Sequence, residues 1–96
     1  MVKGKSVMKI KNGFILRVIA GSYVVIAAGD EAVDFGGMIT VNDTGAFLWK
    51  LLEKGATKSE LTEKLLLEYD VDTETAERDI DEFIEKIRSG NILTDE

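Results

Sequence analysis

The side chains that could do chemistry in this 96-residue chain are carboxylates. The chain has no histidine and no cysteine, so it lacks the usual general base, thiol nucleophile and soft metal ligands of enzymes. From Thr73 onward the acidic residues alternate with apolar ones at helical spacing, which favours a solvated helix face over a metal or acid–base site. We therefore expect no catalytic residues, no metal site, no cofactor and no enzyme activity. The acidic residues just before and along this segment are Asp70, Asp72, Glu74, Glu77, Asp79, Asp81, Glu82 and Glu85.

Charge is distributed unevenly along the chain. The net charge is −6: residues 1–50 carry six Lys/Arg and four Asp/Glu, whereas residues 51–96 carry six Lys/Arg and fourteen Asp/Glu. Because an acidic half repels phosphate backbones, we expect no nucleic-acid partner. No apolar run is long enough to span a bilayer, and the N-terminus lacks the apolar core of a signal peptide. We therefore also expect no membrane partner and a cytoplasmic location.

Three segments have the composition of β-strands. Phe14–Ile19 and Tyr23–Ala28 are rich in β-branched and aromatic residues, and the Ala20-Gly21-Ser22 sequence between them predicts a hairpin. Met38–Val41 predicts a third strand, which leads directly into Asn42, a good helix N-cap. A short strand in this position is a candidate sheet edge whose backbone groups are unpaired on one side.

Three helices are predicted after the strands, over about 43–54, 58–69 and 73–89. Gly55 and Gly90 are suited to end the first and the third. Thr57 with Glu60 fits a capping box before the second, and Asp72 or Thr73 is suited to cap the third. Strands followed by helices imply an α+β fold, here a winged-helix-like, three-stranded antiparallel sheet followed by a three-helix bundle. We expect residues 1–13 to form a polar N-terminal arm and residues 14–96 to form the domain.

One pattern extends over most of the chain from Phe14 onward. Residues 37–45 (GMITVNDTG) lead into the helix, and the matching positions after them are Leu48, Trp49, Leu51, Leu52, Gly55, Thr57, Leu61, Leu65, Tyr69, Asp81, Phe83, Ile84 and Gly90. This pattern resembles the PqqD-like family. The resemblance implies a winged-helix-like domain that binds the leader of a ribosomally made precursor peptide as an added β-strand. Such modules present the precursor to a modifying enzyme, often a radical-SAM protein.

The resemblance implies that the peptide pairs with the third strand and lies between that strand and the third helix. Backbone hydrogen bonds contribute about 1 kcal/mol each, whereas ordering a flexible peptide costs about 1–2 kcal/mol per residue. Apolar side chains must therefore supply most of the affinity. We expect the peptide to dock antiparallel on the strand, with its apolar residues against the helix. The expected peptide-binding residues are Met38, Ile39, Thr40, Val41, Ile80, Phe83, Ile84 and Ile87.

Two other functions remain open from the sequence. A winged-helix DNA-binding regulator would need a basic recognition helix, and the second helix balances Lys58 and Lys64 with Glu60, Glu63 and Glu68. A dimerising structural module would pair the exposed third strand with a second copy of itself. We therefore expect the protein to be a monomer or an edge-paired homodimer.

Overall fold

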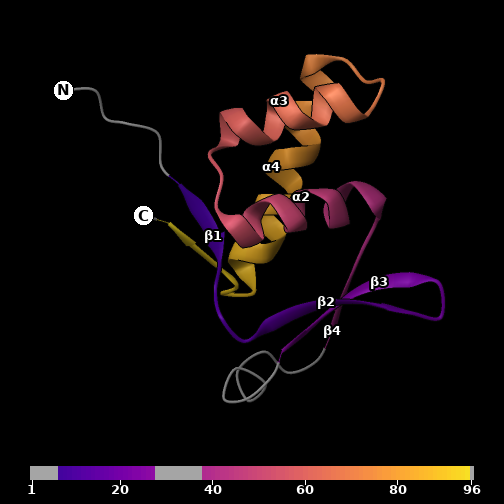
Figure 1. Ribbon diagram of the computed structural model, residues 1–96, viewed down its shortest axis with the longest axis vertical. Helices are drawn as coiled ribbons and strands as arrows, with labels where there is room; N and C mark the ends of the chain where they lie inside the picture. Colours follow the sequence, from indigo (N-terminus) through magenta and orange to yellow (C-terminus); the bar gives the residue numbers. More distant parts are fainter. Residues whose placement is uncertain (1–6, 28–37, 96) are drawn as a thin grey trace.

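The computed structural model describes residues 7–27 and 38–95. Within them, three helices pack on one another, the first of them lies next to a three-stranded sheet built on a hairpin, and a second small sheet pairs strands from near the two ends of the chain (Figure 1). The predicted α+β class, with a three-stranded antiparallel sheet and three helices, is confirmed. The elements are β1 (Met8–Ile10), β2 (Phe14–Ile19), β3 (Ser22–Ala27), β4 (Met38–Val41), α2 (Asp43–Lys54), α3 (Lys58–Glu68), α4 (Thr73–Ser89) and β5 (Leu93–Asp95).

The larger sheet has the strand order β2-β3-β4, and all its strands are antiparallel. The β2–β3 hairpin turns at Ala20 and Gly21, whose φ angles are 51° and 81°. Positive φ at both turn residues is the geometry whose twist matches that of the flanking strands. The register pairs Tyr23 with Val41, which places β4 at one margin of the sheet with β3 on only one side of it.

Each helix begins at a side-chain cap that the sequence predicts. Asn42 caps α2 by accepting a hydrogen bond from the backbone N–H three residues later, at 2.8 Å. Thr57 and Glu60 form the expected capping box, in which each side chain accepts from the other residue's backbone N–H. Asp72 caps α4 by accepting from the Thr75 N–H at 3.0 Å. These caps fix where the three helices start relative to the sheet.

The second sheet differs from the polar N-terminal arm that the sequence predicts. β1 pairs with β5, so that Ile10 lies opposite Leu93, and Met8 also exchanges two backbone hydrogen bonds with Ala56, between α2 and α3. Met8 and Ile10 are buried in the core, while Lys9 between them is exposed. Polar residues dominate residues 1–13, but the apolar residues at alternate positions provide one face of a strand. The predicted arm remains a prediction for residues 1–6, which lie outside the described residues.

One apolar core joins the helices to both sheets. Trp49 is fully buried there, and its indole N–H donates to Glu53 Oε2 at 2.9 Å. The buried members of the core are Met8, Ile10, Phe14, Val25, Val41, Ala46, Leu48, Trp49, Leu52, Ala56, Leu61, Leu65, Ala76, Ile80, Phe83, Ile87, Ile92 and Leu93. Val41 brings β4 into this core, so the strand is anchored to the helices along one face.

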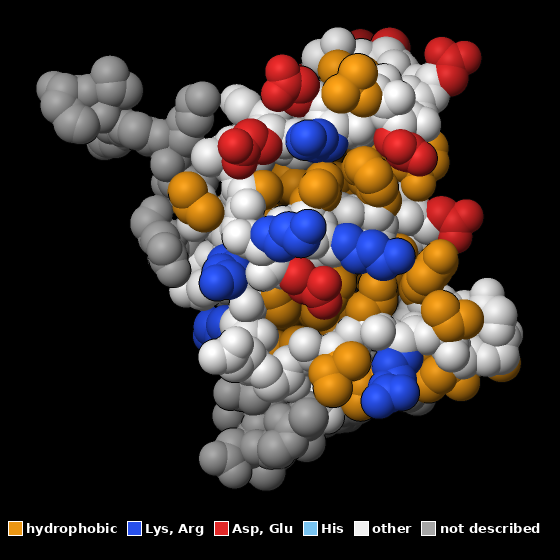
Figure 2. Space-filling view, in the orientation of Figure 1, with side chains coloured by type: hydrophobic (Ala, Val, Ile, Leu, Met, Phe, Trp, Pro, Cys, Tyr) orange, Lys and Arg blue, Asp and Glu red, His pale blue; other side chains and the backbone are white. Residues whose placement is uncertain are grey.

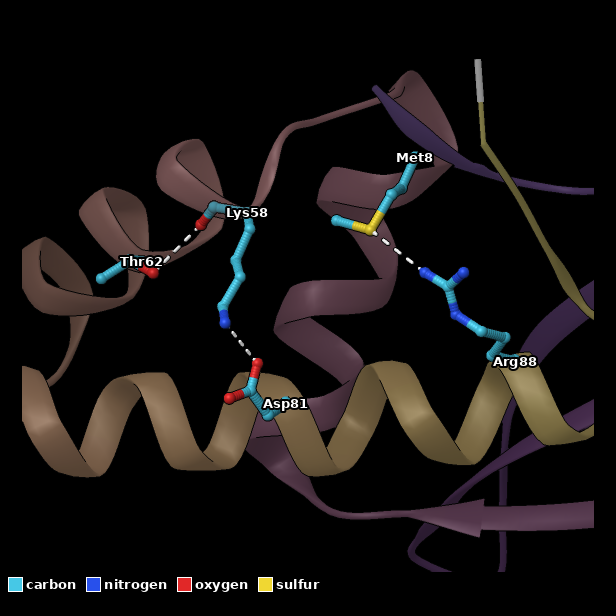
Figure 3. A network of polar contacts seen from close by, with 5 residues as sticks. All are labelled: Met8, Lys58, Thr62, Asp81 and Arg88. Carbon is cyan, nitrogen blue, oxygen red and sulfur yellow. Dashed lines mark hydrogen bonds and ion pairs between the residues drawn. The ribbon is translucent and has the colours of Figure 1, made fainter. Parts of the chain in front are cut away.

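Polar contacts also connect α4 to its neighbours (Figure 3). Lys58 at the start of α3 forms an ion pair with Asp81 on α4, and Arg88 near the end of α4 reaches the Met8 sulfur of β1 at 3.9 Å. Both partners of the ion pair are more than half exposed, so its contribution to stability is small. The position of α4 is therefore set mainly by its buried apolar face. Within residues 7–27 and 38–95, no helix has the length and apolar character needed to cross a membrane.

Candidate functional site

In the part of the chain that the structure describes, no strand pairs with the outer margin of β4. Lys86 Nζ donates to the Thr40 carbonyl oxygen at 3.0 Å, so this carbonyl points away from β3. Because residues in an antiparallel ladder alternate between facing the partner strand and facing away from it, the backbone N–H and C=O groups of Met38 and Thr40 face outward. Those of Ile39 and Val41 face β3. A strand arriving at this margin would meet four backbone groups on two residues.

A groove of about 390 Å³ lies between this margin and α4. Its walls come from β4, from the first turns of α2 and from one side of α4. The floor is apolar, with Val41, Leu48 and Phe83 as its large side chains, whereas its rim carries charged groups. The lining residues are Thr40, Val41, Asn42, Thr44, Gly45, Leu48, Asp79, Glu82, Phe83 and Lys86.

Gly45 allows the groove floor to pack closely. A Cβ atom at this position would lie 3.1 Å from Phe83 Cε1, 3.1 Å from Val41 Cβ and 3.2 Å from Asn42 Oδ1. All three contacts are tighter than ordinary van der Waals contact. The absence of a side chain at Gly45 therefore lets the Phe83 ring rest against the junction of β4 and α2, where it is 7% exposed.

The structure brings some of the predicted site residues into the groove and places others beneath it. Thr40 is exposed, and Thr40, Val41 and Phe83 line the groove. Ile39 and Ile84 are half-buried against the core, and Ile80 and Ile87 have no exposed surface. Met38 belongs to β4 by its backbone, and the prediction for its side chain falls outside what the structure describes.

Sequence reasoning missed several residues that line the groove. Asp79, Glu82 and Lys86 lie on α4, and we had assigned the acids among them only to a solvated helix face. Lys86 follows Phe83 by three residues, so helical spacing places both on neighbouring turns of one side. That spacing indicated that Lys86 lies beside Phe83, but nothing in the sequence indicated that its partner is the Thr40 carbonyl oxygen.

Acidic side chains elsewhere are distributed as a solvated surface. Figure 2 shows them gathered over the end of the molecule where α3 lies, with a lysine or arginine among them. Glu60, Glu63 and Glu68 of α3 are all exposed. In the part of the chain that the structure describes, no three His, Cys, Asp or Glu side chains are placed to hold a metal ion.

Two groups outside the groove have shifted pKa values. The hydrogen bonds from Thr75 lower the pKa of the Asp72 carboxyl, which caps α4. Burial, followed by the nearby negative charges of Glu68 and Asp43, raises the pKa of Tyr69. The Tyr69 ring packs edge-on against Phe47, with 5.6 Å between ring centroids. Both shifts therefore reflect helix capping and packing rather than chemistry in the groove.

These features define a class of protein: a small winged-helix-like domain in which, among the described residues, no strand pairs with the sheet margin beside an apolar helix. This geometry accepts an extended peptide as an extra strand. The family model described as coenzyme PQQ synthesis protein D (PqqD) matches residues 22–93. The chain therefore belongs to the PqqD family, as the sequence pattern predicted. No curated protein matches the chain in sequence.

Solved structures of other proteins have the same fold. TbiB1 in complex with the TbiA(beta) leader peptide is 26% identical, with a TM-score of 0.71 over 88% of this chain and 93% of that one. Lasso peptide synthetase B1 complexed with the leader peptide is 20% identical, with a TM-score of 0.70 over 91% and 96%. The PqqD truncation of Methylobacterium extorquens PqqCD, described as a stand-alone RiPP recognition element, is 21% identical, with a TM-score of 0.71 over 92% and 88%.

Proposed function

We propose that this protein binds the leader segment of a ribosomally made precursor peptide and presents it to a modifying enzyme. The observation that carries the proposal is the outward-facing backbone of Met38 and Thr40 at the margin of β4, next to the groove. An extended peptide completes such a margin with main-chain hydrogen bonds, and pockets beside it select side chains. The family match and the leader-peptide complexes among similar structures support the same function.

The leader lies antiparallel to β4 in this proposal, with apolar side chains over Val41 and Phe83. Ile80 and Ile87 lie one turn before and after Phe83 on the same buried face of α4, so they support the groove floor from beneath. Ile39 and Ile84 are half-buried beside them, and they complete the predicted contact set together with the side chain of Met38.

The protein contributes binding rather than catalysis in this proposal, and it acts in the cytoplasm, where ribosomes make the precursor. A radical-SAM protein is the modifying partner that the family resemblance favours. Because strand addition uses the same margin that a second copy would use, leader binding and edge-paired dimerisation exclude each other.

The test is an NMR titration of ¹⁵N-labelled protein with synthetic leaders of short open reading frames beside its gene. We expect amide shifts centred on Met38–Val41 and on residues 83–87 of α4. Shifts confined to Phe14–Ala27 would contradict this placement, and the absence of any shift with every leader would contradict the function. A DNA duplex added at low salt serves as the control and should leave the spectrum unchanged, because α3 carries exposed glutamates beside its lysines.

A further inference from the structure

Lys86 occupies the sheet margin that a guest strand needs. Its ammonium group donates to the Thr40 carbonyl oxygen, one of the four outward-facing backbone groups of β4. Lys86 itself is exposed, and within the described part of the chain it forms no ion pair. A guest strand brings its own N–H to the same oxygen, so it competes with this ammonium group for the Thr40 carbonyl.

The groove has opposite charges at its two ends. Lys86 lies at Thr40, and Phe83, one turn earlier on α4, lies against Gly45, so α4 and β4 run past each other in opposite directions. Asp79 and Glu82 line the groove on the N-terminal side of Phe83 along α4. A guest antiparallel to β4 runs in the same sense as α4, so its N-terminal half meets the two carboxylates and its C-terminal half meets Lys86.

We infer that Lys86 is a specificity residue that selects a guest peptide with an acidic side chain in the C-terminal half of its docking segment. This inference rests on the proposed strand addition. Once displaced from the Thr40 oxygen, the ammonium group remains at the rim of the groove, where a guest carboxylate competes for it with Glu82, one turn earlier on α4. Repulsion from Asp79 and Glu82 disfavours the guest carboxylate at the other end of the groove, so the charge also sets the guest's direction and register. With no guest bound, the same ammonium group covers the Thr40 carbonyl oxygen of the β4 margin, and charged groups at a sheet edge disfavour unwanted strand pairing.

The experiment selects binders from a phage-displayed library of random twelve-residue peptides on three proteins: wild type, Lys86→Glu and Lys64→Glu. The Lys64→Glu variant is the matched control, because it makes the same charge change at an exposed position of α3 away from the groove. We expect wild type and Lys64→Glu to enrich peptides with Asp or Glu at one fixed position. Lys86→Glu should enrich Lys or Arg at that position.

A second measurement uses one selected peptide and its Glu→Gln analogue, titrated by fluorescence polarisation. Wild type should prefer the acidic peptide about three- to fivefold, as for an exposed ion pair, and the preference should shrink in high salt. Lys86→Met should lose the preference and bind the Gln analogue at least as tightly as wild type does, because no ammonium group then competes for the Thr40 oxygen. A merely structural role for Lys86 would instead weaken both peptides equally.

The outcomes separate this inference from the proposed function. Binders that lack an acidic position, with Lys86→Glu selecting the same peptides as wild type, would overturn the role of Lys86 and leave strand addition standing. A wild-type selection that yields no binder at all would contradict the proposed function and this inference with it. Circular dichroism of each variant checks that it is folded before its selection is compared.

Discussion

Replacing Thr40 by proline tests strand addition directly. The Thr40 N–H faces outward from β4, so the substitution removes no hydrogen bond between β4 and β3. Proline is tolerated in sheets at such edge positions, where its missing N–H would face solvent. The substitution therefore removes one of the four backbone groups offered to a guest and places a ring where the guest's carbonyl would lie.

The expected loss of binding follows from these groups. The lost hydrogen bond is worth about 1 kcal/mol, and the guest carbonyl left without a donor costs about 1 kcal/mol more. A total of about 2 kcal/mol corresponds to a roughly 30-fold weaker dissociation constant. Stability should change by less than about 1 kcal/mol, which in a domain of this size is a shift in Tm of a few degrees.

Calorimetric titration with one selected or leader peptide measures the effect, and thermal melts measure stability. Thr40→Val is the matched control, since it keeps the N–H and the branched side-chain shape, and it should bind within about twofold of wild type. Ile39→Pro is the contrasting variant, because the Ile39 N–H faces β3 and its loss should destabilise the sheet. If Thr40→Pro binds as wild type does while remaining folded, the guest does not use this margin and the reasoning is refuted.

Two further predictions concern the fold around the groove. Gly45→Val should destabilise the domain by about 1–3 kcal/mol, because the new Cβ atom would crowd Phe83 and Val41. Chemical denaturation should therefore show a lower midpoint. An unchanged midpoint would mean that the groove floor has room for a side chain at this position. Hydrogen bonds from Thr75 lower the pKa of Asp72 in the folded protein. The Asp72 carboxylate therefore stabilises α4 fully above the ordinary carboxyl pKa of 3.8, and this stabilisation is lost as the pH falls through the lower folded-state pKa. The Asp72→Asn variant keeps a capping oxygen that does not titrate. Thermal melts should therefore show that its Tm falls less than the wild-type Tm between pH 5 and pH 2. Equal losses of Tm would contradict the role of the Asp72 carboxylate as the cap of α4.

Local signals in the sequence were sufficient to predict the helices and the larger sheet. The three helix starts rest on side chains that bond backbone groups three residues away, so Asn42, Thr57 and Asp72 can be recognised without knowing the tertiary structure. The β2–β3 hairpin depends on a turn of two residues, one of them Gly21. The short strand at Met38–Val41 was recognisable because polar and glycine residues flank it on both sides.

Contacts between distant parts of the chain could not be predicted in the same way. Met8 and Ile10 form a strand because β5 and Ala56 supply its partners from elsewhere in the sequence. The predicted groove residues differ in exposure for a similar reason. Phe83 and Ile87 lie on one helix face, but the placement of β4 decides that Phe83, and not Ile87, lines the groove. Lys86 was missed because its partner is a backbone oxygen, which no side-chain pattern records.

The short β4 margin also constrains what the guest peptide must contain. Four backbone groups contribute about 1 kcal/mol each, and ordering four guest residues costs about 1–2 kcal/mol each, so these two terms leave no net affinity. The protein's own floor residues are already largely buried, with Phe83 at 7% exposed and Val41 at 5%. The gain must therefore come from apolar side chains that the guest itself buries, at about 1.5–3 kcal/mol each. Micromolar binding needs about 8 kcal/mol, and the unrecovered ordering cost raises the apolar contribution required to about 8–12 kcal/mol. A leader that docks here therefore requires roughly three to eight well-buried apolar residues, while Lys86 decides which of the peptides that have them is accepted.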